Sequence, residues 1–274
     1  MAVPTAAQSV GSSRTASMPA PVLEPVSGVA MGLAPSTGIS ATHLSVGDGH
    51  WRGGILFDEG FRSAIRLSAV GDQEIARTIS DVLMISTITG VMAVDAIGAP
   101  AAQGNGDLAW SAAFAHTAAL GITMAAGEII KHAVGRARPF ERECQRDPER
   151  HGCGDGDIFS SFYSLHAGMT FTSAGFSCSM HMSRGLYGDA AADATACGVS
   201  LAMATATGLL RVISDRHYLS DVLVGAAMGF LVGYLVPLAI VQEQDPALPQ
   251  PAAAALTAPS VSGGMIGLTV GGEF

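Results

Sequence analysis

The stretch LSDVLVGAAMGFLVGYLVPLAIV, residues 219–241, decides the fold of this chain. It is apolar after its first turn, and a helix needs about 20 such residues to cross a hydrocarbon core. Four further apolar segments of similar length precede it, at roughly residues 79–99, 109–135, 162–183 and 191–213. The sequence therefore predicts an all-α fold, an antiparallel helical bundle with five long core helices.

The composition favours a multi-pass membrane protein. Hydrophobic residues make up 49% of the chain and charged residues 14%, against roughly 25% charged in soluble domains. The predicted helices are nevertheless rich in Ala, Gly, Ser and Thr, which also suit a tightly packed soluble bundle. A soluble periplasmic protein is thus the alternative. The net charge of −9, with Lys131 as the sole lysine, argues against a nucleic-acid partner.

Three regions are expected along the chain. Residues 1–50 are rich in Ala, Ser, Pro and Gly and predict a disordered tail. Residues 51–241 form the helical domain, which opens with an amphipathic segment, Ile55 to Val70, that would lie on the domain or on a membrane surface. Residues 242–274 predict a polar linker and a possible β-hairpin.

The four cysteines could be either disulfide-bonded or unpaired. Cys144 and Cys153 flank a polar loop and would pair if that loop faces an oxidising compartment, whereas Cys178 and Cys197 lie in apolar helical stretches. Four unpaired thiols fit the sequence equally well. No Cys or His spacing suits zinc, so neither a metal nor another cofactor is expected.

The run KHAVGRARP, residues 131–139, is the first of three motifs with chemical potential. Lys131 and Arg138 are seven residues apart, so in a helix that Pro139 ends both would project from one face and hold an anion. The alternative is a pair of basic side chains that favour the dipole of a helix C-terminus.

The second motif is SFYSLHAGMTF, residues 161–171. It would open a helix with Ser164, the backbone N–H of Leu165 and His166 facing phosphate oxygens. Alternatively, Ser164 only caps the helix and His166 is a surface side chain.

The third motif is LLRVISDRHYLSDVLVG, residues 209–225. It places Arg211 at the end of one helix and His217 four residues before Asp221 at the start of the next. A carboxylate at that spacing can orient an imidazole and fix its tautomer. A structural His–Asp pair is the alternative.

The topology of an up-down bundle favours a functional role for all three motifs over the structural alternatives. In an up-down bundle the end of one helix and the start of the next lie on the same side. Three cations, two imidazoles, a hydroxyl and a carboxylate would therefore meet at one end, which is a pocket suited to phosphate.

These motifs resemble the signature of the type 2 phosphatidic acid phosphatase and vanadium haloperoxidase superfamily over about residues 79–241. The resemblance implies that His217 is the nucleophile, Asp221 orients it and His166 is the general acid. It further implies that phosphate is bound by Lys131, Arg138, Ser164, Leu165 and Arg211. The expected activity is a vanadate-sensitive phosphoric monoester hydrolase, which acts on a phosphomonoester or diphosphate, in particular a lipid phosphate, through a phosphohistidine without a metal.

The chain departs from the family pattern at Tyr163, Leu165 and Leu210. The Leu165 side chain is expected to narrow or dry the pocket, while its N–H remains available. Two alternatives stay open: a haloperoxidase that holds vanadate as its cofactor, and a non-catalytic membrane relative that binds phospholipid.

Two arguments indicate opposite orientations of the chain in the membrane. Apart from Arg184, the basic residues fall on the side of the site or in the N-terminal tail, which by the positive-inside rule indicates the cytoplasm. The cations of the site are accounted for by phosphate, however, and the resemblance implies the periplasmic side, which is the side expected here.

Overall fold

The computed structural model describes residues 51–149, 153 and 157–242, and within them the fold is all-helical, as predicted. The one backbone bridge outside the helices joins Trp51 to Arg136 in the described part. The predicted disordered tail and the β-hairpin fall outside the described residues.

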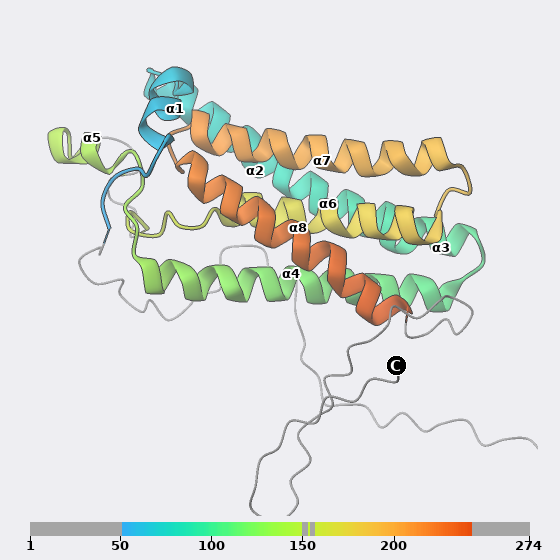
Figure 1. Ribbon diagram of the computed structural model, residues 1–274. Helices are drawn as coiled ribbons and strands as arrows, with labels where there is room; N and C mark the ends of the chain where they lie inside the picture. The colour runs from blue at the N-terminus through green and yellow to red at the C-terminus, as the bar shows by residue number, and fades with distance from the viewer. Residues whose placement is uncertain (1–50, 150–152, 154–156, 243–274) are drawn as a thin grey trace, which may run out of the picture. The chain divides into compact units, whose positions relative to one another are not determined.

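Long helices account for the bundle (Figure 1). They are α2 (Val70–Val91), continued by the π-helix η1 (Met92–Gly98) and α3 (Ala99–Ala102), then α4 (Gly106–Val134), α6 (Leu165–Arg184), α7 (Ala190–Ile213) and α8 (Leu219–Gln242). Two shorter helices, α1 (Asp58–Ile65) and α5 (Glu141–Arg146), lie at one end. The first apolar helix begins earlier than expected, at Val70, and the helix expected from residue 162 begins at Leu165.

The predicted amphipathic segment is helical only over α1. The backbone is extended at Arg66, and α2 starts four residues later. Phe61 and Ile65 pack against the buried Val212 and Val222 at the ends of α7 and α8. The apolar face of α1 therefore covers the domain.

Helix α6 runs through the centre of the bundle and packs most extensively against α8 and α7. Their contact depends on glycine, because a Cβ at Gly229 of α8 would collide with the backbone of Gly168, and a Cβ at Gly233 with that of Thr172. Such close backbone approach is typical of helices packed through small residues. At the site end the Ser164 N–H donates to the Asp221 carbonyl (3.1 Å), which fixes the two helix starts relative to one another.

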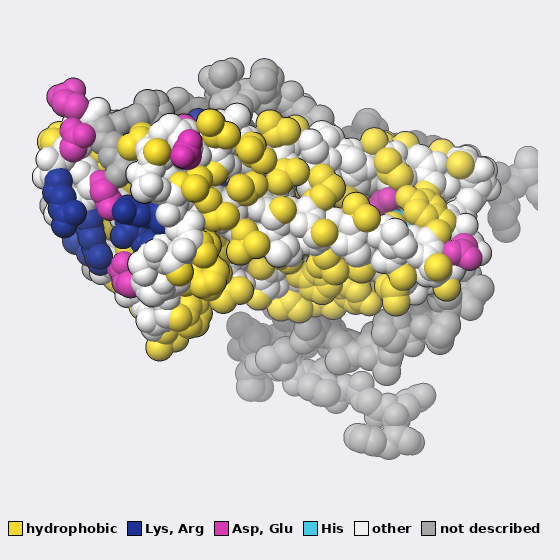
Figure 2. All heavy atoms as spheres, turned by 90° about the horizontal axis from the view of Figure 1, so that it is seen from above, with side chains coloured by type: hydrophobic (Ala, Val, Ile, Leu, Met, Phe, Trp, Pro, Cys, Tyr) yellow, Lys and Arg dark blue, Asp and Glu magenta, His cyan; other side chains and the backbone are white. Residues whose placement is uncertain are grey.

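Four helical stretches of the described chain are long and apolar enough to cross a membrane: residues 70–102, α4, α7 and residues 219–241 of α8. Figure 2 shows hydrophobic side chains along the bundle, with Lys and Arg gathered at one end and Asp and Glu at both ends. Helix α6, expected to be a fifth such segment, does not meet this criterion. Most of its side chains are buried against other helices, so it is built from Ser, Thr, Gly and Ala in place of lipid-facing residues.

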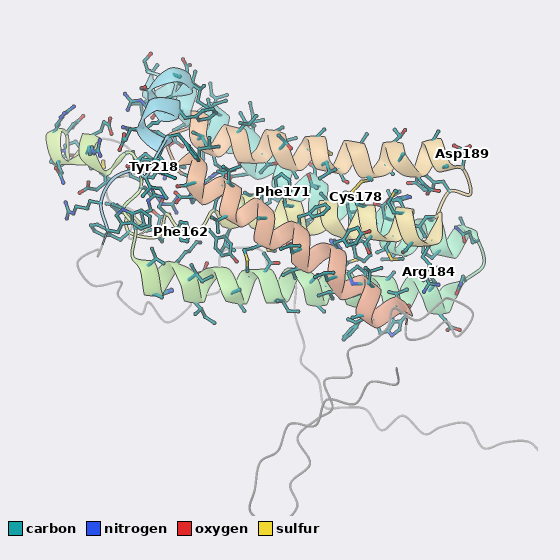
Figure 3. The ribbon with its side chains drawn as sticks, viewed as in Figure 1. Phe162, Phe171, Cys178, Arg184, Asp189 and Tyr218 are labelled. Carbon is teal, nitrogen blue, oxygen red and sulfur yellow. A yellow bond between two sulfur atoms is a disulfide. The ribbon has the colours of Figure 1, made fainter. Side chains whose placement is uncertain are left out.

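Two disulfides join the four cysteines (Figure 3). Cys144–Cys153 closes the loop after α5, and Cys178–Cys197 links α6 to α7. The Cys144–Cys153 disulfide was one of the two interpretations of the sequence. The Cys178–Cys197 disulfide was not predicted, because its two cysteines lie in separate apolar helices.

Candidate active site

The predicted cations and imidazoles come together at one end of the bundle. His217, in the turn between α7 and α8, is 2% exposed. Four charged or titratable side chains lower the pKa of His217: Lys131, Arg138, His166 and Arg211. They come from the end of α4, the loop after it, the start of α6 and the end of α7. Helix termini thus converge on one histidine.

The hydrogen bonds of His217 define its tautomer. Its Nδ1 lies 2.8 Å from the Ser161 carbonyl oxygen, which can only accept. Its Nε2 lies 3.2 Å from Nη1 of Arg138, which can only donate. Nδ1 therefore carries the proton, and Nε2 presents its lone pair to the cluster of cations.

The environment of His217 keeps its ring neutral. Burial, and then the positive charges of Arg138 and Arg211, hold the pKa of His217 well below its ordinary value of 6.5. A neutral imidazole with a free Nε2 lone pair is the form that a nucleophile requires.

Asp221 does not orient His217 in the way the spacing suggests. Its Oδ2 lies 3.7 Å from Nδ1 of the ring and accepts hydrogen bonds from the Ser161 hydroxyl (2.6 Å) and the Tyr218 N–H (2.9 Å). The carboxylate therefore acts on His217 through Ser161, whose carbonyl holds the ring. The direct pairing fails because Asp221 is already occupied by three donors, one of them a guanidinium.

That guanidinium belongs to Arg136, a residue the sequence analysis missed. It is fully buried, pairs with Asp221 (2.5 Å) and Asp58 (2.8 Å), and lies between the rings of Trp51 and Tyr218, each 4.2 Å away. The signal available in the sequence was a second arginine two residues before Arg138. Arg136 is the link between the start of α1 and the start of α8.

Arg138 reaches the site from a loop, which corrects the expected helical face shared with Lys131. Helix α4 ends at Val134 because Gly135 adopts a left-handed conformation (φ 54°), well before Pro139. The Arg138 guanidinium is held by Asp157 (2.7 Å). Lys131 lies in the last turn of α4, 3.1 Å from Glu128.

His166 and Arg211 share a partner, Asp81 of α2. Oδ1 of Asp81 lies 2.8 Å from Nε2 of His166 and 3.1 Å from Nη1 of Arg211. The sequence showed Asp81 only as an interruption of an apolar segment, since its partners are remote in sequence. The Nε of Arg211 is buried with no hydrogen-bond partner in the described part of the chain. A buried N–H group of this kind is suited to bind an oxygen atom of an anion.

The start of α6 shows the helix cap that its motif predicts. Ser164 caps the helix, accepting from the Ala167 N–H at 3.5 Å, and is fully buried. The Leu165 side chain lies against Gly127 of α4, where a Cβ would collide with it. The small Gly127 thus makes room for Leu165 between the helices.

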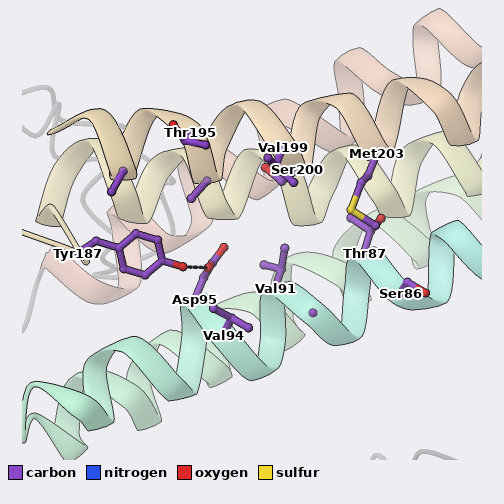
Figure 4. Close-up of a pocket in the computed structure, with 13 residues that line it drawn as sticks. Ser86, Thr87, Val91, Val94, Asp95, Tyr187, Thr195, Val199, Ser200 and Met203 are labelled. Atoms are coloured by element: carbon purple, nitrogen blue, oxygen red, sulfur yellow. Dashed lines mark hydrogen bonds between the residues drawn. The ribbon is translucent and has the colours of Figure 1, made fainter. Parts of the chain in front are cut away.

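A separate cavity of about 510 Å³ lies between α2, η1 and α7 (Figure 4). Its lining includes Asp95, whose carboxylate accepts from the Tyr187 hydroxyl (3.4 Å). None of the predicted site residues lines it. Across the described ranges, no group of three or more His, Cys, Asp or Glu side chains is placed to hold a metal ion.

Within the described residues, the fold is a helical bundle with four helices long and apolar enough to cross a membrane, and two histidines and three cations gather at one end of it. Residues 112–245 match the model of the PAP2 superfamily. A stretch of 121 residues is 32% identical to a protein of Porphyromonas gingivalis named Lipid A 1-phosphatase. That match covers 43% of this chain and 22% of the relative. No solved structure matches the chain.

Proposed function

We propose that this protein is a phosphoric monoester hydrolase that removes phosphate from a membrane lipid. The match to the PAP2 superfamily model, the similarity to a protein named Lipid A 1-phosphatase and four apolar helices support a lipid phosphate as substrate. The observation that carries the proposal is the buried, neutral His217, whose Nε2 faces a cluster of cations.

Phosphate binding follows from the charges. Phosphoryl transfer spreads negative charge over the equatorial oxygens, so fixed positive charge stabilises the transition state. Lys131, Arg138 and Arg211 supply that charge from three elements, and the N-terminus of α6 adds the N–H of Leu165. Ser164, whose hydroxyl caps the same turn, positions this N–H group.

The proposed reaction has two steps. Nε2 of His217 attacks phosphorus as the ester bond breaks, and His166, in its imidazolium form, gives a proton to the leaving oxygen and becomes neutral. The ring then carries a positive charge, stabilised by the Ser161 carbonyl and by Asp221 behind the Ser161 hydroxyl. In the second step His166 takes a proton from water, the hydroxide attacks phosphorus, and the N–P bond breaks to release phosphate.

The site is proposed to face the periplasm. Cys144 and Cys153 form a disulfide in the loop that leads to Asp157, the partner of Arg138. Disulfides persist in oxidising compartments, which supports the periplasmic side over the cytoplasmic one.

The decisive experiment is a panel of substrates: phosphatidate, a prenyl diphosphate, phosphatidylglycerol phosphate and a soluble phosphate ester. We expect phosphate release from at least one lipid, persistence of activity in EDTA, and inhibition by orthovanadate, which mimics the five-coordinate transition state. No phosphate release from any of them would contradict the proposal. Bromide oxidation with added vanadate and peroxide would instead establish the haloperoxidase alternative, and lipid binding without hydrolysis a non-catalytic relative.

A further inference from the structure

An apolar tip stands at the site end of the bundle, formed by Ile55, Leu56 and Phe57 just before α1. Leu56 is 92% exposed, and its neighbours are 38% and 49% exposed. Leu56 also adopts a left-handed backbone conformation (φ 48°), which is unfavourable for a residue with a Cβ. Packing within the protein does not explain an exposed leucine in a strained backbone conformation. Such a residue indicates contact with a lipid phase or with another molecule.

The tip is held rigidly. The Ile55 N–H donates to the Asp58 carboxylate (2.9 Å), and the Gly54 N–H donates to that of Glu59 (3.1 Å). Asp58 is itself fully buried and accepts from the N–H (2.8 Å) and hydroxyl (2.6 Å) of Ser220. The position of the tip is therefore set by the bundle.

These bonds also define the height of the tip relative to a bilayer. Ser220 lies in the first turn of α8, the most apolar of the candidate spans. A tip tied to that turn lies where a spanning helix enters the membrane, at the level of lipid headgroups and the first carbons of the acyl chains. Apolar side chains at this depth are typical of interfacial anchors.

The charges beside the tip are compensated within the protein. Arg142 pairs with Glu59 (2.8 Å), and Arg52 pairs with Glu141 (2.9 Å). The feature presented to a partner is thus hydrocarbon, which favours a lipid surface over an ionic macromolecular partner.

The tip is connected to the chemistry by a short series of hydrogen bonds. The Gly53 carbonyl accepts from Nη2 of Arg136 (3.1 Å), and Arg136 also holds Asp221. Through Ser161, Asp221 in turn supports the ring of His217. The backbone at Gly53 is therefore linked to the groups behind His217, whereas the side chains of the tip take no part in these hydrogen bonds.

We propose that Ile55, Leu56 and Phe57 form a lipid-binding tip that inserts into the membrane interface and contacts the hydrocarbon chains of the lipid whose phosphate enters the site. The inference rests on the proposed function and adds a determinant of substrate class to it. The tip contributes to the reaction of long-chain lipid phosphates in a bilayer and leaves the hydrolysis of soluble esters unaffected.

The test compares the double variant Leu56→Gly, Phe57→Ser with the wild type in proteoliposomes. Glycine suits the left-handed position, so the fold is retained. Burial of two large apolar side chains predicts a loss of about tenfold or more in kcat/KM for phosphatidate, with the rate on p-nitrophenyl phosphate unchanged. The matched control is Trp110→Ser, which removes a 77% exposed aromatic ring near the opposite end of α4 and should leave both rates unchanged.

A direct measurement of depth completes the test. The chain has four cysteines and two disulfides, so Leu56→Cys provides a single free thiol for a nitroxide label. We expect the label to be relaxed more strongly by oxygen than by a water-soluble nickel chelate. A ratio of lipid to soluble rates within twofold of the wild-type ratio would overturn the inference, as would a label open to nickel or shielded from both reagents by protein. Failure of the wild type on both substrates would instead contradict the proposed function.

Discussion

Nε2 of His217 lies 3.2 Å from the guanidinium of Arg138, so the lone pair of a neutral imidazole accepts a hydrogen bond from a cation. This relationship assigns different tasks to the two nitrogens of the ring. Nδ1 is held by a backbone carbonyl, and Nε2 is the nitrogen proposed to attack phosphorus.

The variant His217→Ala should abolish turnover, with a loss of at least about 10⁴-fold in kcat, because it removes the atom that forms the covalent bond. Phosphate release from a lipid and from a soluble ester measures the loss. His132→Ala, at a histidine of α4 whose Nδ1 hydrogen-bonds to the Glu128 carbonyl of its own helix (2.7 Å), is the control and should retain activity. Near-normal turnover in His217→Ala would exclude the nucleophile assignment.

The acid limb of kcat/KM should lie below pH 6.5. The pKa of His217 in the folded protein is below 6.5 owing to burial and the charges of Arg138 and Arg211, so the ring stays neutral until the pH falls through this lowered value. Arg138→Gln removes one of these charges and should move the limb upward while it lowers the rate. A pH–rate profile of both proteins tests this, and an acid limb at or above pH 6.5 in the wild type contradicts it.

Arg136→Gln should destabilise the protein by about 3–5 kcal/mol, because it leaves the buried carboxylates of Asp58 and Asp221 without their cation. Arg142→Gln breaks an exposed pair with Glu59 and should cost less than about 1 kcal/mol. Thermal unfolding in detergent compares the two. Equal losses of stability would show that the ion pairs of Arg136 with Asp58 and Asp221 stabilise the protein no more than a surface ion pair does.

Gly229→Ala should cost about 1–3 kcal/mol, since its Cβ would meet the Gly168 backbone and force α6 and α8 apart. The same substitution at Gly198 of α7, where a Cβ meets nothing within 4 Å, should be neutral or stabilise by up to about 1 kcal/mol. Unfolding midpoints and phosphatase rates of the two variants measure the difference. A Gly229→Ala protein as stable as Gly198→Ala would contradict this account of the helix contact.

The all-helical fold could be predicted because its signals are local. Apolar runs of helical length locate α2, α4, α7 and α8, and the three motifs lie at or next to helix ends that an up-down topology brings together. One expectation about a single residue was wrong for a local reason, because Gly135 ends α4 before Arg138.

What could not be predicted is the set of partners that position the site residues. Asp81 meets His166, and Arg136 meets Asp221, each across 85 residues of sequence. Nothing in a run of sequence specifies such pairs, because they depend on how the helices rotate against one another. The disulfide between Cys178 and Cys197 belongs to the same category.

The polar character of α6 has a consequence for biogenesis. A segment rich in Ser, Thr and His partitions poorly from the translocation channel into lipid by itself. It is synthesised before α7 and α8, which cover much of its surface. Insertion of α6 is therefore expected to wait for these two helices, so that the three enter the membrane as one assembled unit.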